Sequence, residues 1–163
     1  NRYVWSGFNS GAFAPPASGT WSNNYPTYRI QGAELSVRHE INSQWTVFGG
    51  VTMLEPSISN LPYAPKTAVS AGVAGAIGNF RVSVDAQTQE GMYTLTQDRG
   101  EFQPNPVAGF TVANARIAYQ VPALGKKGEV FVALNNLTDA SYQYNAGYPM
   151  SGRNFRIGLM ASF

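Results

Sequence analysis

The chain has 163 residues, a net charge of +2, one histidine and no cysteine. One domain is the expectation at this length. The lack of cysteine excludes disulfide scaffolds and thiol chemistry, and so small a charge excludes the basic surface typical of nucleic-acid binding.

Charged residues make up only 12% of the chain, against a usual share of about 25%. Aromatic residues reach 13%. Few charges and many aromatic rings favour a surface in contact with lipid, where amphipathic rings settle at headgroup level. No apolar run approaches the ~18 residues of a membrane helix, so any membrane crossing must use strands.

Eight segments alternate between apolar and polar residues with the period of a β-strand. Most are near the ~9–11 residues with which a tilted strand crosses a membrane, whereas strands of soluble proteins typically have ~5–6. In chain order the expected strands are 2–8, 28–41, 44–54, 66–77, 80–90, 111–121, 129–136 and 154–163.

The connections between these segments alternate long and short along the whole chain. The long links are 9–27, 55–65, 91–110 and 137–153, and the short ones are 42–43, 78–79 and 122–128. An up-and-down sheet with long loops at one end and tight turns at the other is the layout of an outer-membrane barrel.

One face of the expected sheet is aliphatic and the other is polar. In the last segment, for example, Phe155, Ile157 and Leu159 alternate with Arg156 and Gly158. A soluble protein would turn the polar face to water, and a porin-like wall would turn it to a lumen, so alternation alone fits both. The charged residues expected on the polar face are Glu34, Arg38, Glu40, Arg81, Asp85, Arg116, Glu129 and Arg156.

Small residues on the aliphatic face favour the membrane. They would leave a dry core poorly filled but cost little against fluid lipid. They are Ala33, Gly49, Ala71, Gly75, Ala86, Ala113, Ala115 and Ala161.

Three ordered groups of residues between about Tyr28 and Phe163 resemble motifs of TonB-dependent outer-membrane receptors. Residues 29–35 (RIQGAEL) resemble the R-x-x-G-x-E-L strand of that family, and residues 61–66 (LPYAPK) resemble its L-P-x-x-P segment before a strand. The end of the chain resembles the last two strands, with residues 136–139 (NLTD), Tyr142, residues 147–155 (GYPMSGRNF) and the final Phe163. The sequence departs from the family pattern at Thr138 and Ala161, where aromatic residues are usual.

The resemblance implies an all-β fold: an antiparallel up-and-down transmembrane β-barrel. Such receptors have a barrel of about 22 strands and an amino-terminal plug, so residues 1–163 are interpreted as about eight carboxyl-terminal strands of a larger barrel, without the plug domain. The resemblance also implies TonB-energised uptake of a chelate across the bacterial outer membrane, and a ferric siderophore is the first expectation for that chelate. The implied partners are lipid, the protein's own plug and remaining strands, TonB, the barrel-assembly machinery and the chelate.

The ligand-binding candidates lie near or within the last long link. Tyr142, Tyr144 and Tyr148 have rings that stack on a planar or catecholate ligand, although anchoring or packing between loops is the commoner role of such rings. Arg153 is placed to attract an anionic chelate, with pairing to Asp139 as the stronger expectation.

Gly158 and Phe163 resemble the carboxyl-terminal signal read by the assembly machinery. Neither a catalytic residue nor a metal site nor a cofactor is expected. The single histidine, His39, is expected on the outward face near the short-turn end. The inward carboxylates Glu34, Glu40 and Asp85 are expected to pair with Arg38 and Arg81 or to contact the plug.

Two other protein classes remain as alternatives at this point. Eight strands can close into a self-contained outer-membrane barrel with a structural or adhesive role. A soluble, lipocalin-like barrel with the two faces reversed is the third possibility.

Overall fold

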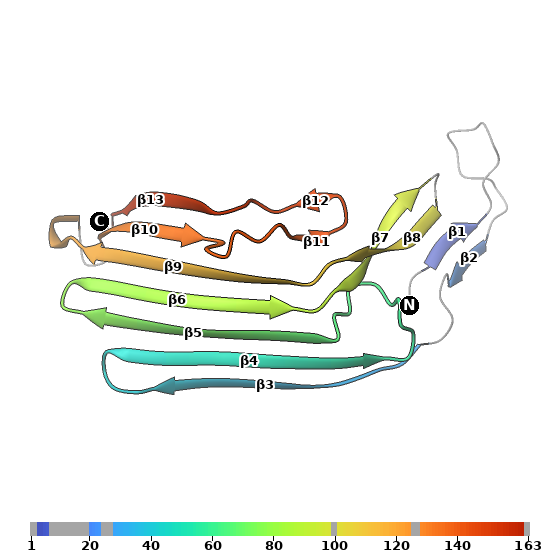
Figure 1. Cartoon of the computed structure of the whole chain (residues 1–163), viewed down its shortest axis with the longest axis horizontal. Coiled ribbons are helices and arrows are strands. Elements are labelled where there is room, and N and C mark those ends of the chain that lie inside the picture. The colour runs from blue at the N-terminus through green and yellow to red at the C-terminus, as the bar shows by residue number, and fades with distance from the viewer. Residues whose placement is uncertain (1–2, 7–19, 24–27, 99–100, 125–127, 162–163) are drawn as a thin grey trace.

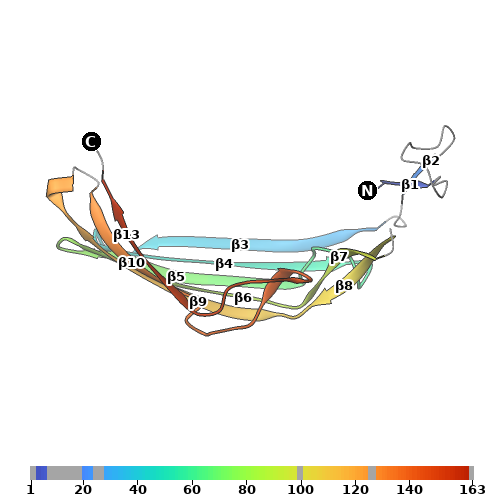
Figure 2. The same cartoon turned by 90° about the horizontal axis from the view of Figure 1, so that it is seen from above.

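The computed structural model describes residues 3–6, 20–23, 28–98, 101–124 and 128–161. Seven strands form one curved, antiparallel sheet (Figures 1 and 2). Among these residues no helix is long or apolar enough to cross a membrane. In chain order the seven strands are β3 (Ile30–Glu40), β4 (Trp45–Pro56), β5 (Thr67–Ile77), β6 (Phe80–Gln89), β9 (Phe110–Gln120), β10 (Glu129–Asn135) and β13 (Asn154–Met160).

Each of these strands pairs with the next one along the chain, as expected of an up-and-down sheet. The turns 41–44 and 78–79 lie at one end of the sheet, together with the 3₁₀ turn η1 (Pro122–Leu124) that follows β9 (Figure 1). The link 55–65 and the described parts of 91–110 and 137–153 lie toward the other end. The predicted alternation of long and short connections is confirmed from β3 to β13.

The first expected strand, 2–8, is a wrong prediction. Its described part, β1 (Tyr3–Ser6), pairs with β2 (Thr20–Asn23) in a separate two-stranded sheet and takes no place beside β3. Four described residues pair on each side. The link 9–27 was expected to be a loop, but it contains the partner strand.

Two further long links contain hairpins where loops were expected. In 91–110, β7 (Met92–Asp98) pairs with β8 (Glu101–Val107), and in 137–153, β11 (Gln143–Asn145) pairs with β12 (Tyr148–Pro149). Pro104 and Pro106 suggested a loop, but they stand two residues apart and so turn their nitrogens to the same side of β8. Because β8 pairs only with β7, that side needs no donors.

The register confirms that the sheet has one aliphatic and one polar face. Leu35 is paired with Val51 and Val51 with Val69, whereas Glu34 is paired with Thr52, and directly paired residues share a face. On the convex face large apolar side chains are exposed, including Leu35 (62%) and Ile157 (69%). A soluble protein rarely exposes so continuous an apolar surface. All eight charged residues assigned to the polar face fall on the concave face.

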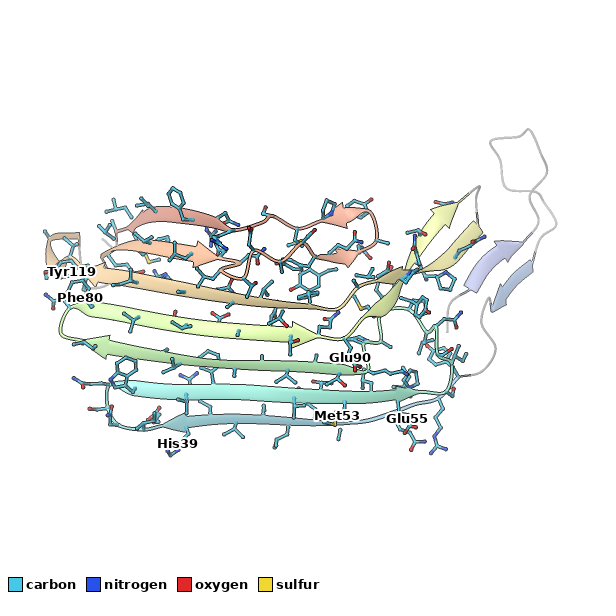
Figure 3. The ribbon with its side chains drawn as sticks, in the orientation of Figure 1. His39, Met53, Glu55, Phe80, Glu90 and Tyr119 are labelled. Atoms are coloured by element: carbon cyan, nitrogen blue, oxygen red, sulfur yellow. The ribbon has the colours of Figure 1, made fainter. Side chains whose placement is uncertain are left out.

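Four of the predicted small residues form a row across the convex face. Gly49 is paired with Ala71, Ala71 with Ala86, and Ala86 with Ala113. At the short-turn end the same face carries aromatic rings. Phe80 and Tyr119 lie side by side with their ring centroids 5.0 Å apart (Figure 3). His39 is exposed on this face near the same end, as predicted. Rings at the rim are typical of a membrane interface.

The sheet is open in the described chain. β3 pairs only with β4 and β13 only with β10, so each leaves one edge without a strand partner. All eleven residues of β3 are exposed. Long strands with free edges need a partner strand, so the arrangement agrees with a piece of a larger barrel and disagrees with closure into a self-contained eight-strand barrel.

Candidate functional site

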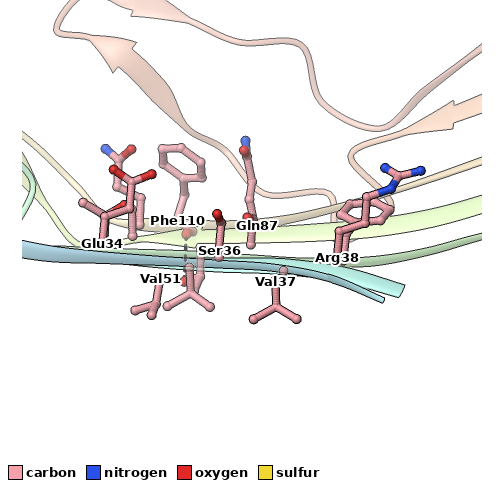
Figure 4. Close-up of a pocket in the computed structure, with 16 residues that line it drawn as sticks. Glu34, Ser36, Val37, Arg38, Val51, Gln87 and Phe110 are labelled. Carbon is pink, nitrogen blue, oxygen red and sulfur yellow. Dashed lines mark hydrogen bonds between the residues drawn. The ribbon is translucent and has the colours of Figure 1, made fainter. Parts of the chain in front are cut away.

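The concave face contains a hollow of about 520 Å³ beneath the long-link end (Figure 4). The side chains that point into it include Glu34, Ser36, Arg38, Gln87 and Phe110. Val37 and Val51 project from the other, convex face of the sheet. This division follows directly from strand alternation. Most side chains that point into the hollow are therefore polar, and the rings of Phe48 and Phe110 also line it.

Three aromatic rings gather where the last long link folds back onto this face. The ring centroid of Phe110 lies 4.5 Å from that of Tyr142 and 5.2 Å from that of Tyr144, and the two tyrosine centroids are 5.6 Å apart. These separations are those of favourable aromatic pairs. We call Phe110, Tyr142 and Tyr144 the aromatic cluster. The side-chain amide of Gln87 donates a 2.6 Å hydrogen bond to the Tyr144 hydroxyl and fixes the cluster to β6.

Burial raises the pKa of the Tyr142 hydroxyl, with a further contribution from Tyr144. Desolvation disfavours a phenolate. The neutral phenol presents a hydroxyl that donates and accepts hydrogen bonds.

The base of the last long link is fixed by Asn136, which is 3% exposed and has a φ of 51°. Its amide nitrogen donates to the carbonyls of Ala140 (2.9 Å) and Ser151 (3.1 Å), and its side-chain oxygen accepts from the Ala140 N–H (3.0 Å). An asparagine tolerates this left-handed backbone and satisfies these buried groups together. The resemblance motif at 136–139 thus ties the end of β10 to the segment before β13.

The other two ligand-binding candidates lie apart from the aromatic cluster. Tyr148 is 73% exposed in the β11–β12 hairpin. The side chain of Arg153 is exposed, and Asp139 accepts a hydrogen bond from the backbone N–H of Arg153 at 2.9 Å. The expected pairing of the two charges is therefore wrong, because the Asp139 carboxylate caps the backbone at the start of β13.

Of the inward carboxylates expected to pair with arginine, Asp85 has a different partner. Asp85 accepts a hydrogen bond from the Asn114 amide at 2.9 Å, and the only ion pairs within the described ranges involve Glu129. Glu129 is bound by Arg116, and its other oxygen lies 4.0 Å from Arg81. The expected pairing of Asp85 with Arg38 or Arg81 is wrong, because Asn114 binds Asp85 and Arg81 lies beside Glu129.

Gly158 lies on the concave face beneath the ring of Phe131, its directly paired residue on β10. A Cβ at Gly158 would overlap that ring. The guanidinium carbon of Arg116 lies 4.5 Å from the centroid of the same ring. Gly158 therefore has a packing role, which is separate from the assembly signal predicted for it. Phe163, the other residue of that signal, lies outside the described residues.

Replacing Gly158 with alanine is expected to lower the free energy of unfolding by about 1–3 kcal/mol, the usual cost of overpacking. Denaturant unfolding of the full-length receptor in detergent measures it. In a Phe131→Ala background the same substitution should cost much less, because the overlapping ring is gone. An equal penalty in both backgrounds would contradict the packing role.

Sequence reasoning missed Phe110, Gln87 and Thr94 as members of the site. Phe110 was assigned to the end of a loop, although it continues the inward alternation of Val112 and Asn114. That alternation was the signal that could have found it. The hydroxyl of Thr94 in β7 accepts a hydrogen bond from the Ala146 N–H in the last long link. Sequence carries no signal for this contact, because the two residues are 52 positions apart.

Known proteins with this fold are outer-membrane receptors. The ferric-catecholate import receptor Fiu from E. coli K12 is 27% identical over 85% of this chain and 21% of its own, with a TM-score of 0.64. The copper transporter OprC is 20% identical over 99% of this chain and 26% of its own (TM-score 0.69). The ferripyoverdine receptor from the outer membrane of Pseudomonas aeruginosa is 18% identical over 95% and 22% (TM-score 0.60).

The chain thus spans between a fifth and about a quarter of the length of these receptors. No curated protein sequence matches it. Residues 3–137 match the family described as "TonB dependent receptor-like, beta-barrel". Proteins of this family are outer-membrane β-barrels of Gram-negative bacteria that transport and do not catalyse. With most of its length matched and its sheet shared with such barrels, this chain belongs to the TonB-dependent receptor family.

Proposed function

We propose that residues 1–163 form the carboxyl-terminal wall and extracellular loops of a receptor for TonB-energised uptake of a ferric siderophore. The observation that carries the proposal is a polar concave face with an aromatic cluster, on a sheet that is 27% identical to part of a ferric-catecholate import receptor. The short turns are then periplasmic and the long links extracellular. The free edges of β3 and β13 support partner strands from the same barrel.

The remaining partners belong to the same proposal. The convex face contacts lipid, the concave face encloses the plug, and TonB acts through a part of the receptor outside this chain. The barrel-assembly machinery inserts the barrel and reads the end of β13. A ferric catecholate is anionic and has planar rings, so it suits the rings of the aromatic cluster together with Arg38, which lines the same hollow as Phe110.

Uptake of radiolabelled ferric tris-catecholate by cells that carry the full-length receptor tests this function. We expect uptake that is lost when TonB is absent. Ferric citrate and Cu²⁺ serve as competitors, because solved relatives include a ferric citrate transporter and a copper transporter. Uptake of Cu²⁺ in place of ferric catecholate would overturn the siderophore assignment.

The double substitution Tyr142→Ala/Tyr144→Ala should weaken binding of ferric catecholate about tenfold, because each ring contributes about 0.5–1.5 kcal/mol. Titration of the purified full-length receptor, followed by tryptophan fluorescence, measures the affinity. Tyr119→Ala is the matched control, since it removes a tyrosine from the convex face. An equal loss in both variants would contradict a role for the aromatic cluster.

A further inference from the structure

Three of the long links meet at two adjacent residues of β7. The backbone carbonyl of Tyr93 accepts a 2.7 Å hydrogen bond from the N–H of Tyr63, in the second long link. The next residue, Thr94, accepts a 3.1 Å hydrogen bond at its hydroxyl from the N–H of Ala146, in the last long link. β7 itself belongs to the third long link.

Thr94 is fully buried and its partner Ala146 is 8% exposed. Tyr63 contacts the residues on both sides of Thr94, since its hydroxyl also accepts from the Leu95 N–H at 3.3 Å. A backbone N–H that is buried away from water needs a partner. Within the described residues the Thr94 hydroxyl is the acceptor for the Ala146 N–H. Tyr63, in the second long link, helps to hold Thr94 in place through its hydrogen bonds to Tyr93 and Leu95.

Ala146 stands two residues after Tyr144 and four after Tyr142. All three residues belong to the last long link, the segment 137–153. Asn136 fixes this segment near its start, and Gln87 fixes the Tyr144 hydroxyl. We infer that Thr94 is a positioning residue that fixes the far end of this segment and holds the aromatic cluster in its ligand-ready arrangement. The inference rests on the proposed function for its effect on the chelate, but not for its effect on the segment.

The closing experiment compares Thr94→Val, Thr94→Ser and Thr96→Val in the full-length receptor. Valine keeps the shape of threonine and removes the hydroxyl, and serine restores it. Thr96 is the matched control, because its hydroxyl contacts only Asn105 of the same hairpin (3.5 Å) among the described residues. Hydrogen–deuterium exchange of the Ala146 amide and chemical labelling of the Tyr142 and Tyr144 phenols report the segment without any ligand.

We expect Thr94→Val to raise the exchange rate of the Ala146 amide at least tenfold and to increase phenol labelling. Ferric tris-catecholate should bind about tenfold more weakly, while the unfolding midpoint of the barrel is unchanged. Thr94→Ser and Thr96→Val should behave as wild type. Retained protection of Ala146 in Thr94→Val would overturn the inference, as would unchanged affinity for a chelate that the wild type binds. A wild-type receptor that binds no ferric chelate would refute the proposed function instead, and exchange and labelling would still decide whether Thr94 holds the segment.

Discussion

Replacing Leu35 with arginine is expected to destabilise the barrel by about 2–4 kcal/mol, the cost of a charge on the lipid face at the bilayer midplane. Leu35 is the central residue of β3 and projects from the convex face. Arginine there must leave water for hydrocarbon or draw lipid headgroups inward. Guanidinium unfolding of the full-length receptor in lipid vesicles measures the loss.

Ser36→Arg is the matched control for this prediction. Ser36 is the next residue of the same strand, is exposed as Leu35 is, and faces the hollow with Gln87. The two substitutions therefore differ only in the face to which the charge is added, and Ser36→Arg should cost less than about 0.5 kcal/mol. Equal and small effects at both positions would show that both faces meet water, which would refute the lipid-facing assignment.

The strand order and the two faces were predictable because both depend on local chemistry. A period of two residues fixes which side chains share a face, and tight turns such as 78–79 force neighbouring strands to pair. For β3, β6 and β13 the predicted faces agree with the register. The choice between lipid and core came from residue size, since Gly49, Ala71 and Ala86 cannot fill a dry interior.

The hairpins within the long links were not predictable in the same way. β1 and β2 are four residues each, and β11 and β12 are shorter still, so alternation has too few residues to be recognised. Proline in β8 suggested a loop, because sequence does not show that this strand lacks a second neighbour. Short strands are stabilised by contacts made after the chain has folded, and those contacts leave no periodic signal.

The candidate site was predictable only in part for the same reason. Tyr142 and Tyr144 were identified by residue type and position in the last link, and their stacking with Phe110 agrees with that choice. Tyr148 and Arg153 were chosen by the same criteria of residue type and position, but both are exposed outside the aromatic cluster. What separates the two groups is contact with β6 and β9, through Gln87 and Phe110, and such long-range contacts cannot be read from one sequence.

The buried carboxylate of Glu129 gives the second large effect. Glu129 is 5% exposed on the concave face, where Arg116 binds one oxygen and Arg81 lies 4.0 Å from the other. Removing one member of a fully buried ion pair costs about 3–5 kcal/mol, because the remaining charge is left without compensation. The Arg116 side chain is 35% exposed, so water screens part of that charge and reduces the expected cost to about 2–3 kcal/mol. Glu129→Ala should lower the free energy of unfolding by that amount in the full-length receptor, as measured by guanidinium unfolding.

Most of this loss should come from Arg116 and not from Arg81, whose side chain is 53% exposed and therefore screened by water. The guanidinium carbon of Arg116 also lies 4.5 Å from the centroid of the Phe131 ring, and this contact favours the concave face for Arg116 when Glu129 is removed. Glu34→Ala, on the same face and exposed, should change stability by less than about 0.5 kcal/mol. In an Arg116→Met background Glu129→Ala should cost far less, because the substitution then leaves no Arg116 charge without its partner. An undiminished cost in that background would mean that Glu129 stabilises the wall without the ion pair.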